Sequence, residues 1–329
     1  MRFLKILLVL FAVITVSSAQ ETGEQSKLTE NQVDSVDIID IIETETKLSP
    51  DFSNDVNNDA AVDAIKEGNN FWRAGKPEQA VTSYQRAVNL EPGLYPAQFN
   101  LGMALLRIKQ FLNAEFAFNE AIRIEPKSTA AWQGLGFARY YRRSFSLAVD
   151  AFTQAQHLAP NDPATNNNLG FGYLFVARFD DAALAFETAL HLEPKFGPAK
   201  NGLCAAYALA KESKQALQAC LSAAAAHRES AVPQYFLGSV YLDQKDARNA
   251  LKAFERAARL EPRVARVYVG LGFAYYQLEN YQQALKYFEQ AQTMNPKVEN
   301  ALLGIASRKV SCLLTPAESL SMSRVVERS

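Results

Sequence analysis

Cysteine and histidine are scarce in this sequence, and charge of one sign does not dominate it. Among 329 residues there are three cysteines and three histidines, and 34 lysines and arginines face 35 acidic residues. Three cysteines are too few for a disulfide-rich scaffold, and three histidines are too few for a histidine-rich metal site. A net charge of −1 argues against binding of nucleic acid through bulk positive charge. We therefore expect no nucleic-acid partner.

Motifs of catalysis and cofactor binding are also missing. The sequence has no glycine-rich phosphate loop, no nucleophile elbow and no HExxH pair. His157 and His191 stand at equivalent places near the ends of predicted helices, where a solvated basic residue is favourable. His227 has no recognisable partner. We predict a protein that is not an enzyme, with no catalytic residue, no metal and no cofactor.

Residues 1–19 have the pattern of a secretory signal peptide. Arg2 and Lys5 precede an uncharged apolar run at 6–16, and small residues at the −3 and −1 positions of a cleavage site end the segment at Ala19. A retained membrane anchor is the alternative, but the run has 11 residues, whereas a bilayer requires about 20. No later segment reaches that length. We expect an exported protein, periplasmic or secreted, without a stable membrane span in its mature form.

Residues 20–60 are an acidic arm. They contain 11 acidic residues and two lysines among many asparagines, serines, threonines and glutamines. Such a composition buries too little apolar surface to offset the entropy of ordering, so we expect the arm to be disordered. Residues 36–43 (VDIIDIIE) differ, because they contain four isoleucines with acidic residues placed between and beside them. This stretch has the composition of a short amphipathic element that docks, although a solvated linker is the simpler interpretation.

From residue 61 onward a motif returns every 34 residues. A Leu-Gly pair at the 7th and 8th places recurs in most repeats, alanines recur at the 20th and 27th places, and a large residue stands at the 24th place. The large residues are Tyr84, Phe118, Phe152, Phe186, Phe254 and Phe288, with Cys220 in the fifth repeat. The seven repeats span 61–94, 95–128, 129–162, 163–196, 197–230, 231–264 and 265–298.

Each repeat contains two stretches of helical apolar periodicity joined by a short polar turn, so we predict an all-α fold. The glycine of the first helix and the alanine of the second allow the backbones to approach closely, and the large residue fills the space between them. A proline near the end of most repeats stops the second helix. One pair of helices cannot bury its apolar face alone, whereas stacked pairs form a continuous core.

These positions resemble the tetratricopeptide repeat family over residues 61–298. The resemblance implies a right-handed superhelical solenoid of seven helix-turn-helix repeats, with the first helix of each repeat on the concave face. Residues 299–314 begin an eighth repeat that lacks its second helix, so we expect 299–329 to be a C-terminal capping helix and tail. The two or three domains that the length suggests thus reduce to one solenoid with an N-terminal arm.

The fifth repeat departs from the motif at two places. Cys204 replaces the glycine of the 8th place, and Cys220 replaces the large residue of the 24th. Side chains lean toward the N-terminus of their own helix, which tilts these two toward each other in an antiparallel pair. A disulfide formed in an oxidising compartment is one interpretation, and two small buried hydrophobic residues are the other. Cys312 is left over.

The resemblance also places a set of aromatic and amide side chains on the concave face. They are Asn69, Phe99, Asn100, Phe137, Tyr140, Tyr141, Asn167, Phe171, Phe175, Asn201, Tyr235, Phe273 and Tyr276. Rings with scattered amides suit an extended peptide or a glycan, although aromatic residues at helical spacing often belong to the core instead. The two-carboxylate clamp of chaperone-binding members is incomplete, because Ile65, Ala130 and Gly134 occupy its basic places.

Basic residues recur in the turns within the repeats. They are Arg73, Lys76, Arg107, Lys109, Arg142, Arg143, Arg178, Lys211, Lys214, Lys245 and Arg248. Solvation and the helix dipole account for such residues. The functional interpretation is a basic rim for an acidic partner, or for the protein's own arm.

We therefore expect an exported interaction scaffold that binds a protein or peptide partner in its concave groove. Two alternatives stay open. One is a glycan-binding protein of cell-envelope or polysaccharide biogenesis, and the other is a chaperone-like assembly factor. A further hypothesis treats the acidic arm as a pseudo-ligand of the basic rim.

Overall fold

The structure, a computed structural model, describes residues 59–294. The predicted signal peptide at 1–19, almost all of the acidic arm and the predicted capping helix and tail lie outside the described residues. Within the described range the chain forms fourteen α-helices and no strand, so the predicted all-α class is confirmed.

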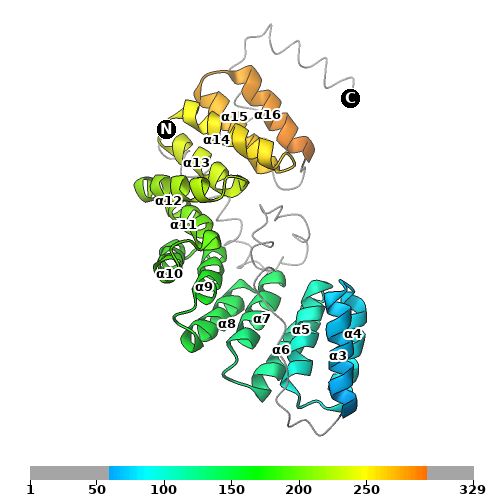
Figure 1. Ribbon diagram of the computed structural model, residues 1–329. Coiled ribbons are helices and arrows are strands. Elements are labelled where there is room, and N and C mark those ends of the chain that lie inside the picture. Colours follow the sequence, from blue (N-terminus) through cyan, green and yellow to red (C-terminus); the bar gives the residue numbers. More distant parts are fainter. Residues whose placement is uncertain (1–58, 295–329) are drawn as a thin grey trace, which may run out of the picture. The chain divides into compact units, whose positions relative to one another are not determined.

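The helices follow one another as seven pairs, one pair in each 34-residue repeat (Figure 1). They are α3 (Asp59–Arg73), α4 (Pro77–Leu90), α5 (Tyr95–Arg107), α6 (Phe111–Ile124), α7 (Thr129–Tyr141), α8 (Phe145–Leu158), α9 (Pro163–Phe175), α10 (Phe179–Leu192), α11 (Gly197–Ala210), α12 (Ser213–Ala226), α13 (Ala231–Asp243), α14 (Ala247–Leu260), α15 (Ala265–Gln277) and α16 (Tyr281–Met294). We call the first helix of each pair A and the second B. Helix α3 starts two residues before the predicted repeat boundary.

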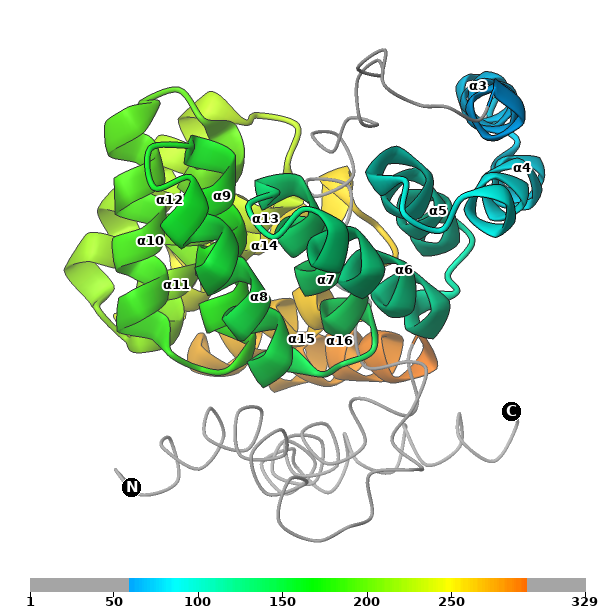
Figure 2. The ribbon, with the colours of Figure 1, turned by 90° about the horizontal axis from the view of Figure 1, so that it is seen from below.

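The described residues divide into two compact units, and the boundary falls inside α11, between Gly202 and Leu203. The N-terminal unit holds α3 to α10 with the start of α11, and the C-terminal unit holds the rest of α11 with α12 to α16. Each unit has its own buried cluster. In the N-terminal unit, Figure 2 shows α3 and α4 side by side, and α5 lies next to α6.

Local sequence explains where the helices begin and end. Pro163 opens α9, and the side chain of Asp162 caps this helix by accepting a hydrogen bond of 2.9 Å from the backbone N–H of Thr165. Each A helix ends in a tight turn whose 15th-place residue has a positive φ. At the end of α5 this residue is Lys109, and the backbone N–H of Gln110 donates back to the carbonyl of Leu105.

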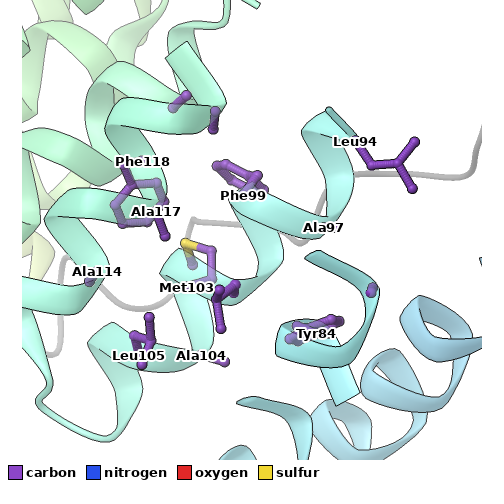
Figure 3. Packing of buried hydrophobic residues seen from close by; sticks show 14 of the residues in the cluster. Tyr84, Leu94, Ala97, Phe99, Met103, Ala104, Leu105, Ala114, Ala117 and Phe118 are labelled. Atoms are coloured by element: carbon purple, nitrogen blue, oxygen red, sulfur yellow. The ribbon is translucent and has the colours of Figure 1, made fainter. Parts of the chain in front are cut away.

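The 24th-place ring holds the helix pairs together. Phe118 of α6 is fully buried, and Figure 3 shows its ring beside Phe99 of α5. A Cβ added at Gly102 of α5 would lie 2.8 Å from the ring, and one at Gly134 of α7 would lie 2.4 Å from it. The ring therefore occupies space that only glycine leaves open on both neighbouring A helices. Phe186 (with Gly170 and Gly202) and Phe254 (with Gly238 and Gly270) have the same arrangement.

Candidate functional site

The side chains expected on the concave face divide into two classes by burial. Seven of the thirteen are buried, and six are partly exposed. The buried ones are Phe99, Asn100, Phe137, Tyr140, Asn167, Phe171 and Asn201. The partly exposed ones are Asn69, Tyr141, Phe175, Tyr235, Phe273 and Tyr276. Of the nine aromatic rings in this set, four are buried and five keep some exposure.

Five of the nine rings, three of them buried, pack against the 24th-place ring of their own repeat. Phe137 meets Phe152 edge to face at 5.2 Å between ring centroids, and Phe171 meets Phe186 at 5.0 Å. The other pairs of this kind are Phe99–Phe118, Tyr235–Phe254 and Phe273–Phe288. Edge-to-face pairs of this kind stabilise a core beyond the area they bury. These rings therefore contribute to packing within their own repeats.

The amides of the first two repeats bond to each other. The hydroxyl of Tyr84 donates to Asn69 Oδ1 at 2.8 Å, and Asn100 Nδ2 donates to the same oxygen at 3.2 Å. Burial raises the pKa of Tyr84, so its hydroxyl stays protonated and remains a donor at neutral pH. The acceptor capacity of Asn69 is thus used inside the protein.

The amides of the fourth and fifth repeats differ from these. Asn167 is 3% exposed and Asn201 is 6% exposed, and among the described residues neither Oδ1 atom has a hydrogen-bond partner. Both residues hold the 5th place of an A helix, Asn167 on α9 and Asn201 on α11, and both belong to the N-terminal unit. A buried acceptor without a donor costs about 1–3 kcal/mol, and Gln277 Oε1 in the C-terminal unit is a further buried acceptor of this kind.

A third amide at the same place was missed in the sequence. Gln133 is the 5th residue of its repeat on α7, and its Nε2 donates to Thr165 Oγ1 of α9 at 2.5 Å. The signal that could have found it is the run of amides at one place in repeats three, four and five. Gln133, Asn167 and Asn201 form what we call the amide row.

Two stacked aromatic pairs stand at the turns between A and B helices. Phe111 stacks on Tyr141 at 5.0 Å, and Phe145 stacks on Phe175 at 5.3 Å. In both pairs the 17th-place ring of one repeat covers the 13th-place ring of the next, and all four rings keep some exposure. Phe111 and Phe145 were missed because the sequence pattern assigned no role to the first residue of a B helix.

The basic turn residues are exposed, and some have carboxylate partners. Glu115 is nearly buried and accepts hydrogen bonds from Arg139, at 3.0 Å, and from Arg142. Arg178 pairs with Asp181 at 2.7 Å, and in the C-terminal unit Lys211 pairs with Asp243 at 2.8 Å. No ion pair involves Lys109 or Arg143 within residues 59–294.

The structure joins Cys204 of α11 and Cys220 of α12 by a disulfide, with their Cα atoms 4.5 Å apart. Both residues are fully buried in the C-terminal unit. Phe236, at the 6th place of the next repeat, packs against the same cluster. Other repeats have glycine or a polar residue at that place, so Phe236 supplies ring volume where the small Cys220 does not.

Metal ligation, membrane insertion and the histidines also bear on function in the part of the chain that the structure describes. No group of three or more histidine, cysteine or acidic residues there is arranged to hold a metal ion. No helix between residues 59 and 294 is long and apolar enough to cross a membrane. His157 and His191 are exposed near the ends of α8 and α10.

Comparisons with known proteins agree with this architecture. A family model described as Tetratricopeptide repeat matches residues 65–129 and 235–299. A tetratricopeptide repeat protein from Parabacteroides merdae superimposes with a TM-score of 0.63 at 15% identity, over 77% of this chain and 99% of that one. The Cut9–Hcn1 hetero-tetramer of APC/C gives 0.60 at 14% identity, over 76% and 53%. Pseudomonas aeruginosa PilF gives 0.54 at 18%, over 67% and 97%. Such identities show the fold alone, and no curated protein matches the chain.

Proposed function

Because the chain is a tetratricopeptide repeat protein, and such proteins mediate protein–protein interaction, we propose that it is an exported scaffold that binds an extended segment of a partner protein. Proteins of this family are typically not catalysts. In this proposal the repeats hold a fixed row of hydrogen-bonding side chains, and an extended segment of the partner protein lies along that row.

The observation that carries this proposal is the pair of unpartnered amide oxygens, Asn167 Oδ1 and Asn201 Oδ1. Both oxygens are buried in the unbound protein, so a backbone N–H of a bound segment would donate to them only after the side chains that cover them move aside. Formation of the bond would remove the cost of the unpaired acceptor, and that gain would contribute to the free energy of binding. Backbone recognition of this kind depends little on the sequence of the partner.

The spacing of the amide row favours an extended ligand. Adjacent packed helices lie about 8–10 Å apart, so equivalent residues on successive A helices are separated by a similar distance. An extended chain rises about 3.1–3.4 Å per residue, and three residues therefore match one repeat. A helical ligand rises only about 1.5 Å per residue and would offer no free backbone N–H groups in its interior.

Export is supported by two independent features of the chain. Residues 1–19 have the signal-peptide pattern, and Cys204 and Cys220 form a disulfide. Disulfides persist in oxidising compartments and are rare in the cytosol of mesophiles. An alkaline phosphatase domain, which requires disulfides, fused after residue 60 is expected to be active only if the leader directs export.

The glycan-binding alternative has no comparable observation in its favour. Sugar stacking requires open ring faces, and Phe137, Phe171 and Tyr140 are each less than 10% exposed, which leaves the partly exposed rings of the set for such contacts. The chaperone-like assembly factor would use the same segment-binding site, so it is a biological setting for the proposal rather than a different chemistry.

The test selects binding peptides from a random displayed library with the mature chain, residues 20–329, and then measures their affinity by calorimetry. The variant Asn167→Leu/Asn201→Leu is close to isosteric and removes both unpaired acceptors, so it should fold at least as stably as the wild type. We expect a loss of at least tenfold in affinity. The matched control, Asn119→Leu on the exposed face of α6, should bind normally.

A second readout separates backbone recognition from side-chain recognition. Methylation of single backbone nitrogens in a selected peptide should reduce affinity at positions three residues apart, whereas most alanine substitutions should have little effect. Failure to select any peptide, or equal binding by the double leucine variant, would contradict the proposal.

A further inference from the structure

We propose that residues 36–43 of the chain's own arm dock on the turns between A and B helices in the N-terminal unit, against Lys109, Arg143 and the stacked rings beside them. We call this surface the AB edge. It consists of the turns at 74–76, 108–110, 142–144 and 176–178 with the adjoining helix ends. The proposal is independent of the peptide that the amide row binds, because the occupant here is intramolecular.

The two edges of the N-terminal unit have different charge. The AB edge carries seven basic residues and three acidic ones. The basic residues are Arg73, Lys76, Arg107, Lys109, Arg142, Arg143 and Arg178, and the acidic ones are Glu78, Asp180 and Asp181. The opposite edge, formed by the turns between repeats with the adjoining helix ends, carries five acidic residues, Asp59, Glu91, Glu125, Asp162 and Glu193, and three basic ones, Arg123, Lys127 and Lys195. An acidic segment is therefore attracted to the AB edge and repelled from the other.

The helix dipole does not account for this polarity. A basic residue is favourable at the C-terminus of any helix, and an acidic one is unfavourable there. The residue that follows the B helix is nevertheless glutamate in three of the four repeats of the N-terminal unit, at Glu91, Glu125 and Glu193. Both edges contain helix C-termini, yet only the AB edge is basic.

Two of the basic residues stand in a backbone conformation that glycine adopts more easily. Lys109 has φ of 61° and Arg143 has φ of 62°, whereas the first repeat has Gly75 at this place with φ of 67°. A side chain in the left-handed region is strained. The chain carries a strained cation at each of these places, both exposed and without an ion pair among the described residues. The same conformation occurs at Ala177 and Glu279, so it belongs to the turn itself, and we base the docking on the charge and exposure of Lys109 and Arg143.

Apolar surface lies next to these charges. Phe111 follows Lys109 by two residues and stacks on Tyr141, and Phe145 follows Arg143 by two residues and stacks on Phe175. The four rings are partly exposed. Residues 36–43 combine four isoleucines with Asp37, Asp40 and Glu43, so the segment matches both the apolar and the basic character of the surface. The other acidic stretches of the arm lack this apolar content.

The tether between the segment and the fold is long enough. Fifteen residues separate Glu43 from Asp59, the first residue of α3, and they span up to about 50 Å when extended. The tether has to reach from the first residue of α3 to the AB edge of the third repeat. That distance is about 22 Å along the 15 residues of α3 plus about 10 Å for each of two repeats, which is less than the length of the extended tether. The covalent link gives the segment a high effective concentration at the AB edge.

Zero-length carbodiimide cross-linking of the mature chain, residues 20–329, followed by mass spectrometry, tests the contact. We expect Lys109 and Lys76 to link to Asp37, Asp40 or Glu43. Lys127 and Lys195 are equally exposed on the opposite edge and serve as internal controls. A mixture of isotopically labelled and unlabelled chains distinguishes links within one chain from links between chains.

A variant that keeps the backbone conformation of the turn but removes one positive charge tests the role of that charge. Arg143→Gln keeps a long side chain in the left-handed conformation and removes one cation, so the yield of Lys109 links should fall at least threefold, and 1 M salt should have a similar effect. Lys127→Gln is the control and should leave the yield unchanged. Three results would overturn the proposal. They are cross-links equally frequent at Lys127, cross-links found only between chains, and a yield of Lys109 cross-links that Arg143→Gln does not change.

Discussion

Substitution of Gly134 by alanine tests how tightly the 24th-place ring is held. Gly134 lies inside α7, and alanine is intrinsically favoured over glycine in a helix by about 0.8–1.0 kcal/mol. The new Cβ would lie 2.4, 2.6 and 2.8 Å from three carbons of the Phe118 ring, where contacting carbons prefer about 3.5–4.0 Å. The ring is fully buried and meets Gly102 on α5, so it has little room to move away.

Overpacking of this kind costs about 1–3 kcal/mol, and the strain here affects two helix interfaces together. We place the total near the upper limit. After subtraction of the helix-propensity gain, the N-terminal unit should lose about 2 kcal/mol of unfolding free energy. Gly172→Ala in α9 is the matched control, because its nearest contact is 3.1 Å and the propensity gain should offset most of the strain.

Urea unfolding followed by tryptophan fluorescence measures this effect. The chain has two tryptophans, Trp72 on α3 and Trp132 on α7, so the signal comes from the N-terminal unit. A combined Gly134→Ala/Phe118→Leu variant should be more stable than the sum of the two single effects predicts, by about 1 kcal/mol, because the smaller side chain admits the methyl group. A Gly134→Ala protein as stable as the wild type would refute the packing argument.

Three other predictions concern single features of the fold. Cys204→Ala/Cys220→Ala should lower stability by about 3 kcal/mol, since the disulfide closes a 17-residue loop, and reductant should then have no further effect on urea unfolding. Lys109→Gly should raise the melting temperature through relief of about 1 kcal/mol of left-handed strain, and Ala177→Gly, with φ of 57°, should do the same without a change of charge. Tyr84→Phe should cost about 1 kcal/mol at neutral pH through loss of the hydrogen bond to the neighbouring amide. Because burial raises the folded-state pKa of Tyr84 above the unfolded value of 10.0, its stabilisation is present below pH 10 and declines above it, so the two proteins should converge in stability on alkaline titration.

The helix pairs could be predicted from the sequence because the 34-residue period repeats without an insertion. Packing of each helix pair requires a glycine at the 8th place, an alanine at the 20th and a ring at the 24th. These are requirements on side-chain volume, which follows directly from the residue type. The same reasoning anticipated that Cys204 and Cys220 face each other. It did not reveal the second glycine contact of Phe118, because Gly134 belongs to the next repeat and only stacking brings it to the ring.

The groove was less predictable for the same reason. Resemblance to a family places Phe137 and Phe171 on the concave side of a helix, but whether such a ring is exposed depends on the neighbouring side chain that covers it. Sequence spacing also cannot distinguish a paired amide from an unpaired one. Asn69 and Asn167 are both asparagines on A helices, yet the hydroxyl of Tyr84 bonds to the first, and no described donor reaches the oxygen of the second.

The sequence by itself determined the repeat, the helix pairs, and the unlike charges of arm and turns, because these depend on the order of residue types along the chain. Only the tertiary structure decided which polar groups remain unpaired and which cations are strained. Those properties depend on donors and acceptors brought together from different repeats, and on backbone angles at the turns. Asn167, Asn201, Lys109 and Arg143 acquire their proposed roles in this way.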